Sequence, residues 1–226
     1  MSEINELKLQ NLVDFNHTIS GELLKNYEYP WQVLPEIKSI ILSIGETLDA
    51  NEFDQIEENI WVHKTAKIAK TASISSPCII CANAEIRHCA FIRGSALVGE
   101  NCVVGNSVEL KNVILFDNVQ VPHYNYVGDS ILGYKSHMGA GSITSNVKSD
   151  KKLVTIKFET DKIETALKKF GAILGDNVEV GCNSVLNPGT VVGKNTNLYP
   201  LTLARGYYPA NSIVKNTDTV VKKVDK

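Results

Sequence analysis

The strongest constraint on the fold of this chain is a repeat of six residues that begins near Val62. An aliphatic side chain returns at every sixth position for nine repeats: Val62, Ile68, Ile74, Ile80, Ile86, Ile92, Val98, Val104 and Leu110. The same spacing returns after a slip in frame between Leu115 and Met138, and again between Leu174 and Leu198. Neither the 3.6-residue period of a helix nor the two-residue alternation of a single strand produces this pattern.

A period of six fits a chain that winds as a prism with three flat faces, in which each hexapeptide makes one short strand and one corner. The aliphatic residue points into the axis, and a small residue such as Ala66 or Ala72 fills the corner. Three hexapeptides make one coil, and stacked coils bury a continuous core. The predicted fold class is therefore mainly β, a parallel β-helix; its left hand is implied by resemblance to the hexapeptide-repeat superfamily.

The remaining segments divide around this repeat. Residues 1–57 are predicted to form a small helical cap at the N-terminus, because residues 34–48 carry one apolar helical stripe and a solenoid end needs covering. The β-helix domain is expected to span residues 58–203, followed by a basic, mobile tail over residues 204–226. Residues 145–172 interrupt the repeat, and Asp161 with Glu164 resembles a capping box that opens a short helix.

Composition excludes several classes of partner and location. Hydrophobic residues make up 43% of the 226 residues and charged residues 21%, as in a globular protein with a core. The net charge of −2 gives no reason to expect nucleic acid or an anionic membrane as a partner. No apolar run approaches the length of a membrane span, and the first residues lack the apolar core of a signal peptide. The five cysteines are an odd number, which favours reduced thiols in a cytoplasmic protein.

The segment VPHYNYVGDS, residues 121–130, departs most from the repeat because it places polar and aromatic side chains where a strand is expected. Two cations occur upstream of it: Arg93 and Lys111 are 18 residues apart, which is the length of one coil. They are therefore expected to stack and to form an anion site, such as one for a phosphate. His123 follows on the next coil, so a base and a phosphate site would face one groove.

Residues 121–146, VPHYNYVGDSILGYKSHMGAGSITSN, resemble the acetyltransferase half of the bifunctional uridyltransferase that makes UDP-N-acetylglucosamine. They are still more similar to the same half of archaeal and bacterial sugar-1-phosphate nucleotidylyltransferases, over roughly residues 60–215. The resemblance implies a homotrimer with sites between subunits, acetyl-CoA as co-substrate, a hexosamine 1-phosphate as acceptor, and no metal. Residues 1–60 are too few for the nucleotidyltransferase domain, so this chain is not expected to make a nucleotide sugar by itself.

The resemblance also implies roles for individual residues. His123 is the expected general base. The backbone N–H of Ala140, within the corner Gly139-Ala140-Gly141, is expected to contact the acetyl group. The expected substrate contacts are Arg93, Lys111, Tyr126, His137 and Asn146, and the expected acetyl-CoA contacts are Ala140, Cys182 and Pro200. His137 stands where one branch of the family has an asparagine, which leaves the choice between glucosamine and galactosamine 1-phosphate open. Two further hypotheses are that Glu109 orients His123, and that Lys151, Lys152 and Lys157 contact phosphates.

Three other interpretations were weighed against this one. Cys78 and Cys81 form a CxxC pair, but Cys78 occupies a small corner position and no second pair exists, so a zinc site is disfavoured. His88, His123 and His137 raise the possibility of a trimeric zinc enzyme, yet separations of 35 and 14 residues do not fit an 18-residue coil. The main alternative is a non-catalytic hexapeptide scaffold or regulatory partner of a sugar nucleotidyltransferase, which need not bind acetyl-CoA.

Overall fold

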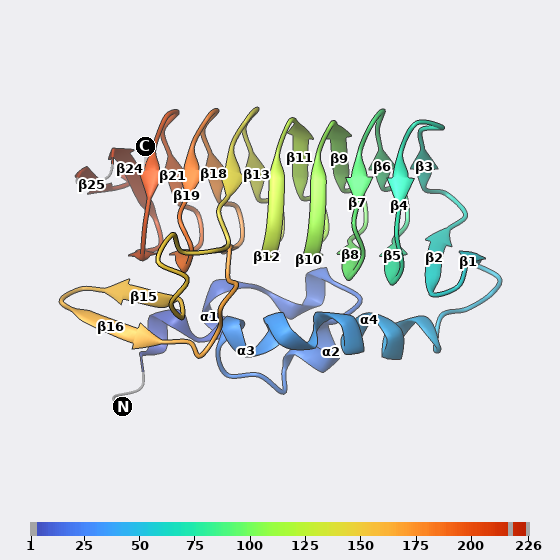
Figure 1. Cartoon of the computed structure of the whole chain (residues 1–226), viewed down its shortest axis with the longest axis horizontal. Helices are drawn as coiled ribbons and strands as arrows, with labels where there is room; N and C mark the ends of the chain where they lie inside the picture. Colours follow the sequence, from blue (N-terminus) through green and yellow to red (C-terminus); the bar gives the residue numbers. More distant parts are fainter. Residues whose placement is uncertain (1–3, 217–218, 225–226) are drawn as a thin grey trace.

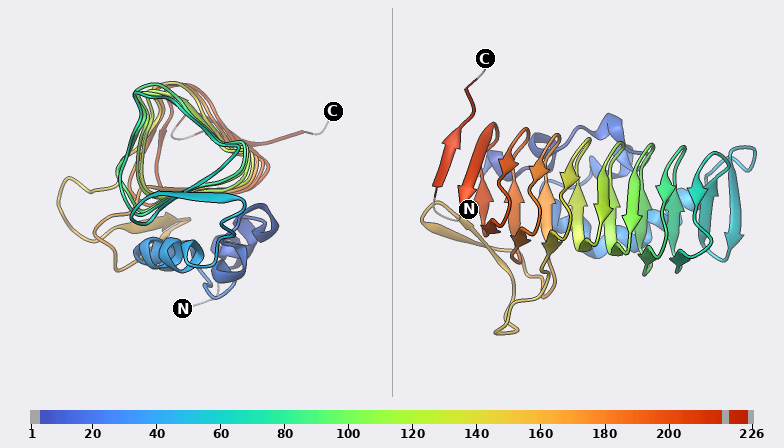
Figure 2. Two further views of the ribbon diagram at one scale, coloured as in Figure 1. Left: turned by 90° about the vertical axis from the view of Figure 1, so that its right-hand side faces the viewer. Right: turned by 90° about the horizontal axis from the view of Figure 1, so that it is seen from above.

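The computed structural model describes residues 4–216 and 219–224, and its main body is a parallel β-helix (Figure 1). Seen along its axis, the chain traces a triangle whose coils lie in register (Figure 2). The inward aliphatic residues of the repeat form the core: Ile80, Ile92, Val104 and Leu110 have exposed fractions of 0%. The predicted fold class is confirmed.

Three faces, numbered in the order in which the chain meets them, make up the prism. Face 1 contains β2 (Ile60–His63), β5 (Cys78–Ile80), β8 (Ala96–Val98), the second halves of β10 (Glu109–Leu115) and β12 (Tyr126–Leu132), β17 (Ala172–Leu174), β20 (Thr190–Val192) and β23 (Tyr207–Tyr208). Face 2 contains β3 (Lys67–Ile68), β6 (Glu85–Ile86), β9 (Val103–Asn106), β11 (Gln120–His123), β13 (His137–Met138), β18 (Glu179–Val180), β21 (Asn197–Leu198) and β24 (Ser212–Asn216). Face 3 contains β4 (Ser73–Ile74), β7 (Phe91–Ile92), the first halves of β10 and β12, β14 (Ile143–Thr144), β19 (Val185–Leu186) and β22 (Leu203–Ala204). The corners joining them are named the 1–2, 2–3 and 3–1 edges.

Sharp corners give the prism its edges, and asparagine is the residue that makes many of them. Of the 19 described non-glycine residues with positive φ, nine are asparagines: Asn59, Asn83, Asn101, Asn112, Asn118, Asn177, Asn183, Asn195 and Asn211. Asparagine tolerates the left-handed region better than most other residues with a Cβ, since its short polar side chain bonds locally. Asn59 lies in the antiparallel hairpin before β2, and the other eight turn the chain from one face to the next.

The N-terminal helices lie along face 1 (Figures 1 and 2). The helical elements are η1 (Asn5–Leu7), α1 (Leu9–Leu12), η2 (Phe15–His17), α2 (Gly21–Leu24), α3 (Pro30–Val33), η3 (Leu34–Glu36) and α4 (Ile37–Gly45), and α4 contacts β5, β8 and β10. The expectation that they cap an end of the solenoid is wrong. The physical reason lies in face 1, where the outward residues are also apolar and buried: Trp61, Ile79, Leu97, Ile114, Ile131, Ile173 and Val191.

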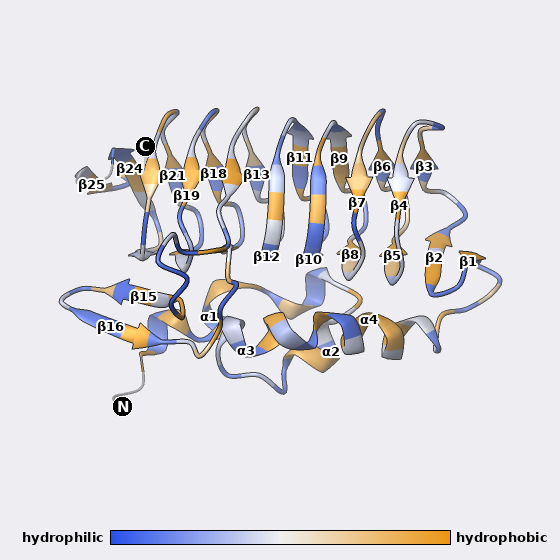
Figure 3. Ribbon diagram, viewed as in Figure 1, coloured by the Kyte–Doolittle hydropathy of each residue, from blue (hydrophilic) through white to orange (hydrophobic). Residues whose placement is uncertain are grey.

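Burial of this second apolar layer is what holds the helices in place. Figure 3 shows hydrophobic residues recurring along α4. Ile37, Ile41 and Ile44 of α4 are buried in the same cluster as the outward residues of face 1. Each such side chain contributes on the order of 1.5–3 kcal/mol when it leaves water. The helices therefore cover the outer surface of face 1, and they do not cover the outer surfaces of faces 2 and 3.

The insertion between β14 and β17 forms a hairpin. Its strands β15 (Thr155–Phe158) and β16 (Asp161–Glu164) pair antiparallel, so the expected short helix after Asp161 is wrong. The alternation of buried Ile156 and Ile163 with exposed lysines is the pattern of half-buried strands. This tertiary burial prevails over the local capping signal.

The solenoid continues past residue 203, where the tail was expected to begin. Strand β24 still stacks on β21, and β25 (Thr219–Lys222) folds back on β24 as an antiparallel hairpin. At the other end β1 (Phe53–Glu57) pairs antiparallel with β2. Both ends of the solenoid thus carry an antiparallel strand. Among the described residues, the structure contains no helix with the length and apolar character needed to cross a membrane.

Candidate functional site

Face 3 and its two edges carry most of the residues singled out by the sequence. At the 2–3 edge, His123 and Ala140 occupy successive coils, and Cys182 and Pro200 follow in the next two. Backbone hydrogen bonds join these corners, from the Gly141 N–H to the His123 carbonyl at 3.0 Å, from Asn183 to Ala140 at 2.9 Å, and from Leu201 to Cys182 at 2.9 Å. The expected base and the expected acetyl-CoA contacts therefore form one column.

A buried asparagine that the sequence analysis did not single out holds the His123 corner. Asn125 is 2% exposed, and its Oδ1 accepts a hydrogen bond from the His123 N–H at 3.1 Å. Its Nδ2 donates to the carbonyl oxygens of Gly139 at 2.9 Å and Ser142 at 3.0 Å. One amide thus ties two successive corners together. The His123 imidazole lies outside this network, on the exposed side of the corner.

The neighbouring corner presents a backbone donor. No described residue accepts a hydrogen bond from the Ala140 N–H, while the N–H groups on both sides of it are bonded. Gly141 has φ of +72°, and a Cβ there would lie 2.2 Å from Asn183 Oδ1. The glycine therefore leaves room for the Asn183 side chain at this corner. The corner can donate its free N–H to an oxygen placed beside His123.

At the 3–1 edge, Arg93 and Lys111 stack on successive coils, as the 18-residue separation predicts, because Ile92 and Leu110 are paired residues of β7 and β10. Each cation already has a carboxylate partner. Arg93 Nη1 lies 2.6 Å from Glu109 Oε1, and Lys111 Nζ lies 3.5 Å from both oxygens of Asp129. Glu109 therefore pairs with Arg93, and no described contact joins Glu109 to His123, the residue that it was expected to orient. An incoming phosphate would have to share these cations.

Asp129 is the centre of a buried polar cluster at this edge. It is 4% exposed and accepts hydrogen bonds from Asn112 Nδ2 at 3.1 Å and Asn146 Nδ2 at 2.5 Å, besides its contact with Lys111. The Asn146 amide also lies 3.1 Å from the Tyr126 hydroxyl. Three of the predicted substrate contacts, Lys111, Tyr126 and Asn146, are therefore brought together around one carboxylate.

The Tyr126 side chain can extend toward this cluster because Gly128, two residues further along β12, has no side chain in its way. A Cβ on Gly128 would lie 2.5 Å from the Tyr126 hydroxyl oxygen, so the ring lies flat over this glycine. Burial raises the pKa of the Tyr126 phenol, and the charges of Asp129 and Glu109 raise it further. The hydroxyl therefore stays protonated at neutral pH and can donate to a bound oxygen.

His137 does not join this cluster. It lies on face 2 at the start of β13, and its Nδ1 is 2.9 Å from Glu179 Oε2. The lysines of the insertion, Lys151, Lys152 and Lys157, are exposed. No described hydrogen bond or ion pair joins His137 or these lysines to the Asp129 cluster, and their roles stay predictions.

Neither zinc interpretation gains support from the described residues. Cys78 and Cys81 are buried free thiols, and burial raises the pKa of Cys78 to about 12. His88 bonds to Thr71 at 3.0 Å, and His137 to Glu179. Within the described ranges no group of three or more His, Cys, Asp or Glu side chains is placed to hold a metal ion.

The stacked coils and the six-residue repeat define a hexapeptide-repeat β-helix, and the polar edge cluster and the exposed histidine corner make face 3 the candidate site. The family model described as the GMPPB C-terminal domain matches residues 74–208, more than half of the chain. The chain belongs to this family. The matched segment runs from β4 to β23 and includes every predicted site residue.

Similarity to curated proteins is confined to part of each relative. A bifunctional protein GlmU from Methanococcus vannielii is 36% identical over 116 residues, which are 51% of this chain and 28% of that protein. A bifunctional sugar-1-phosphate nucleotidylyltransferase/acetyltransferase from Sulfurisphaera tokodaii is 32% identical over 93 residues, 41% of this chain and 23% of that protein. The chain therefore matches about a quarter of the length of these relatives.

Among solved structures, one similar chain is a mutant of AntD, an N-acyltransferase from Bacillus cereus, in complex with dTDP and coenzyme A. It aligns with 19% identity and a TM-score of 0.39, covering 71% of this chain and 82% of that one.

Proposed function

We propose that this protein is an acetyl-CoA-dependent N-acetyltransferase that acts on the amine of a hexosamine 1-phosphate. The observation that carries the proposal is the 2–3 edge, where the exposed His123 imidazole and the free Ala140 N–H lie on consecutive coils joined by one hydrogen bond. A base and an oxyanion donor are the two groups that acyl transfer to an amine requires. The resemblance of residues 121–146 to sugar-phosphate acetyltransferases supports the same assignment.

In the proposed mechanism the acceptor, having released its ammonium proton to solvent, attacks the thioester carbonyl carbon as a neutral amine, and His123 takes a proton from the nitrogen as the C–N bond forms. The Ala140 N–H hydrogen-bonds to the carbonyl oxygen as it gains negative charge. The C–S bond then breaks, an amide forms, and the leaving thiolate takes a proton from the His123 imidazolium. Histidine is the side chain whose ordinary charge change lies closest to neutral pH, and it is accordingly a common general base in enzymes. No residue of the chain forms a covalent intermediate.

The acceptor is proposed to bind on face 3, between the two edges. Tyr126 and Asn146 offer a hydroxyl and an amide to sugar hydroxyl groups, and Lys111 with Arg93 attracts the phosphate. Asp129 and Glu109 hold these cations in place before the ligand arrives. The phosphate would compete with these two carboxylates for Arg93 and Lys111.

Acetyl-CoA is proposed to approach along the 2–3 edge, past Cys182 and Pro200. Cys182 is exposed, so an extended thiol arm can contact this column. The exposed side chains of Tyr124 and Leu201 belong to the same edge, and exposed apolar groups of this size often mark an interface. They agree with a homotrimer whose sites lie between subunits, which we propose on the family resemblance. The five free thiols agree with the cytoplasmic location that we also propose.

The competing candidate is a non-catalytic partner of a sugar nucleotidyltransferase. The observation in its favour is that Arg93 and Lys111 already have carboxylate partners, so the charges of the anion site are balanced. Calorimetric titration with acetyl-CoA separates the two candidates, because a scaffold needs no acyl donor. Mass spectrometry of the acceptor after incubation then tests transfer: a gain of one acetyl group on glucosamine or galactosamine 1-phosphate supports the enzyme, and no binding with no product supports the scaffold.

A further inference from the structure

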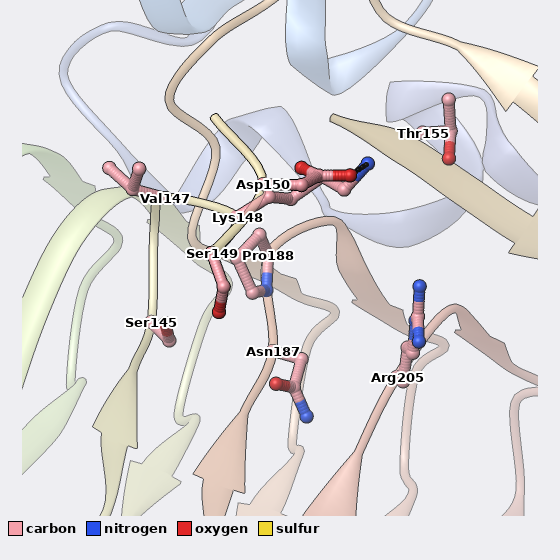
Figure 4. A pocket seen from close by; sticks show the side chains of 9 residues that line it. All are labelled: Ser145, Val147, Lys148, Ser149, Asp150, Thr155, Asn187, Pro188 and Arg205. Carbon is pink, nitrogen blue, oxygen red and sulfur yellow. Dashed lines mark ion pairs between the residues drawn. The ribbon is translucent and has the colours of Figure 1, made fainter. Parts of the chain in front are cut away.

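A cleft of about 310 Å³ opens between the insertion and the late coils of face 3. Figure 4 shows the side chains arranged around it: Ser145, Val147, Lys148, Ser149, Asp150, Thr155, Asn187, Pro188 and Arg205. This volume is at the lower end of the range for small-molecule sites and exceeds what a single phosphate ion fills.

The insertion that walls this cleft is fixed against the solenoid. Gly189 and Gly206 form corners of the 3–1 edge with φ of +82° and +80°. A Cβ on Gly206 would lie 2.5 Å from the Lys157 carbonyl oxygen, and one on Gly189 would lie 2.8 Å from a methyl carbon of Val154. The hairpin thus packs directly on two bare corners. At its base the Phe170 N–H donates to the Asn146 carbonyl at 3.0 Å, so the cleft is preformed.

The charges around the cleft favour an anion. Lys148 lies 3.3 Å from Asp150, so these two charges balance each other. No described residue forms an ion pair or hydrogen bond with the Arg205 guanidinium, which leaves a full positive charge on the wall of the cleft. Ser145, Ser149, Thr155 and Asn187 add neutral polar groups. An arginine with donors around it is the usual arrangement for binding a phosphate.

A second, wider cleft shares Lys148, Asp150 and Thr155 with the first and extends the positive field. Its lining adds four cations, Lys151, Lys152, Lys162 and Lys168, and a single further acid, Glu164. Cations gathered along one wall attract anions from solution and raise their local concentration. The second cleft thus gathers cations of the insertion next to the cleft that Arg205 lines.

The cleft is continuous with the acceptor site. Ser145 directly precedes Asn146, and Ser145, Asn187 and Arg205 follow one another in successive coils at the end of the face 3 strands. Neighbouring strands lie roughly 4.8 Å apart, so Arg205 is about 10 Å along the axis from the coil of Asn146. A ligand of nucleotide size spans that distance from the sugar-contacting residues.

We propose that this cleft is a binding site for the phosphate groups of a nucleotide, with Arg205 as their direct contact. The proposal rests on the proposed function for its place in the reaction, because acetyl-CoA carries such a group and a nucleotide-linked amino sugar, in place of the 1-phosphate, would carry one too. The acceptor can carry a nucleoside diphosphate on its sugar, or the donor can place its adenosine bisphosphate end there. Both sources share the phosphate ester chemistry that Arg205 recognises.

Calorimetric titration of the whole chain with UDP and with adenosine 3′,5′-bisphosphate tests this site. We expect one of the two to bind, which identifies the source, and we expect Arg205→Gln to weaken that binding at least tenfold. Arg87→Gln is the matched control, because Arg87 pairs with Glu85 on face 2 and should change the affinity less than twofold. Ser149→Trp fills the cleft from an exposed position and should also abolish binding. Arg205 is exposed, so its variant should keep the unfolding temperature of the native protein.

Two outcomes overturn the proposal: neither nucleotide binds, or one binds with the same affinity to the Arg205→Gln and Ser149→Trp variants. The transfer assay, run alongside, keeps this failure distinct from failure of the proposed function. Acetylation of glucosamine 1-phosphate without nucleotide binding would support the proposed function and refute the nucleotide site. Arg205-dependent nucleotide binding without any acetyl transfer would support the nucleotide site and refute the proposed function.

Discussion

The Gly141 N–H donates a hydrogen bond of 3.0 Å to the carbonyl oxygen of His123, which joins two successive corners of the 2–3 edge. The bond uses only backbone atoms of His123, so the imidazole takes no part in holding the corner. Because Asn125 binds the same two corners from inside, the position of the imidazole relative to Ala140 is fixed by the coil itself. The side chain can therefore be replaced without loss of the corner.

Tyr126 and Asn146 provide a test of acceptor binding. Tyr126→Phe keeps the ring over Gly128 and removes the hydroxyl that lies 3.1 Å from Asn146. Loss of one hydrogen bond to the sugar is worth about 1 kcal/mol, so we expect KM for the amino sugar phosphate to rise roughly fivefold, with kcat changed less than about twofold. Steady-state kinetics measure both. Tyr27→Phe, among the N-terminal helices, is the control, and equal effects of the two variants would contradict the assignment.

The Asp129 cluster should matter for stability as well as for the site. Asp129→Asn tolerates the φ of +48° but removes the charge that faces Lys111 and Asn112. Lys111 is partly exposed, so we expect unfolding free energy to fall by about 2 kcal/mol, less than for a fully buried pair. Urea denaturation at neutral pH gives the value. Asp54→Asn removes an exposed pair with Lys64 and should cost under about 0.5 kcal/mol.

Asp117 makes stability depend on pH. Burial raises its pKa to about 6 from an ordinary value near 3.8, so between these values the folded state binds more protons than the unfolded state. Its contribution to stability is therefore greatest below about pH 4 and is lost as the pH rises through 6. Asp117→Asn, which keeps an acceptor for the Glu100 N–H, should gain roughly 1 kcal/mol over the native protein at pH 7, allowing for partial exposure. The gain should vanish at pH 4. Urea denaturation at both values checks this, and a gain that does not change with pH would refute it.

Cys182 tests the path of the acyl donor. Its corner follows that of Ala140, and the thiol is exposed, so a large side chain there fills the edge without disturbing the core. Cys182→Trp should raise KM for acetyl-CoA at least tenfold and leave the unfolding temperature unchanged. Cys182→Ser conserves size and should behave as the native protein. Unchanged kinetics in the tryptophan variant would place the donor elsewhere.

The β-helix was predictable because its signal is redundant. Few folds other than a β-helix are compatible with nine aliphatic residues at a spacing of six. The 18-residue length of a coil also predicted that Arg93 and Lys111 stack, which the pairing of β7 with β10 confirms. These inferences needed only the spacing of residues along a regular coil.

The features that were missed depend on contacts between elements. Trp61, Ile79 and Leu97 recur every 18 residues beside the inward column, and this signal marks a face covered by helices; only the inward column was followed. The hairpin was missed because the capping pattern at Asp161 is local, whereas the burial of Ile156 and Ile163 depends on packing against the solenoid. The cleft beside Arg205 exists only because the insertion returns to Gly189 and Gly206, which no spacing in the sequence indicates.

The central claim is that His123 is the general base of an acetyl transfer, and free-CoA release from acetyl-CoA tests it most directly. Glucosamine and galactosamine 1-phosphate serve as acceptors, and His88→Ala is the control, from the same edge two coils earlier. We expect release by the native protein and the control, and a loss of about 10²–10⁴ in rate for His123→Ala at an unchanged unfolding temperature. Equal rates for the native protein and His123→Ala, or no release with either sugar, would contradict the account.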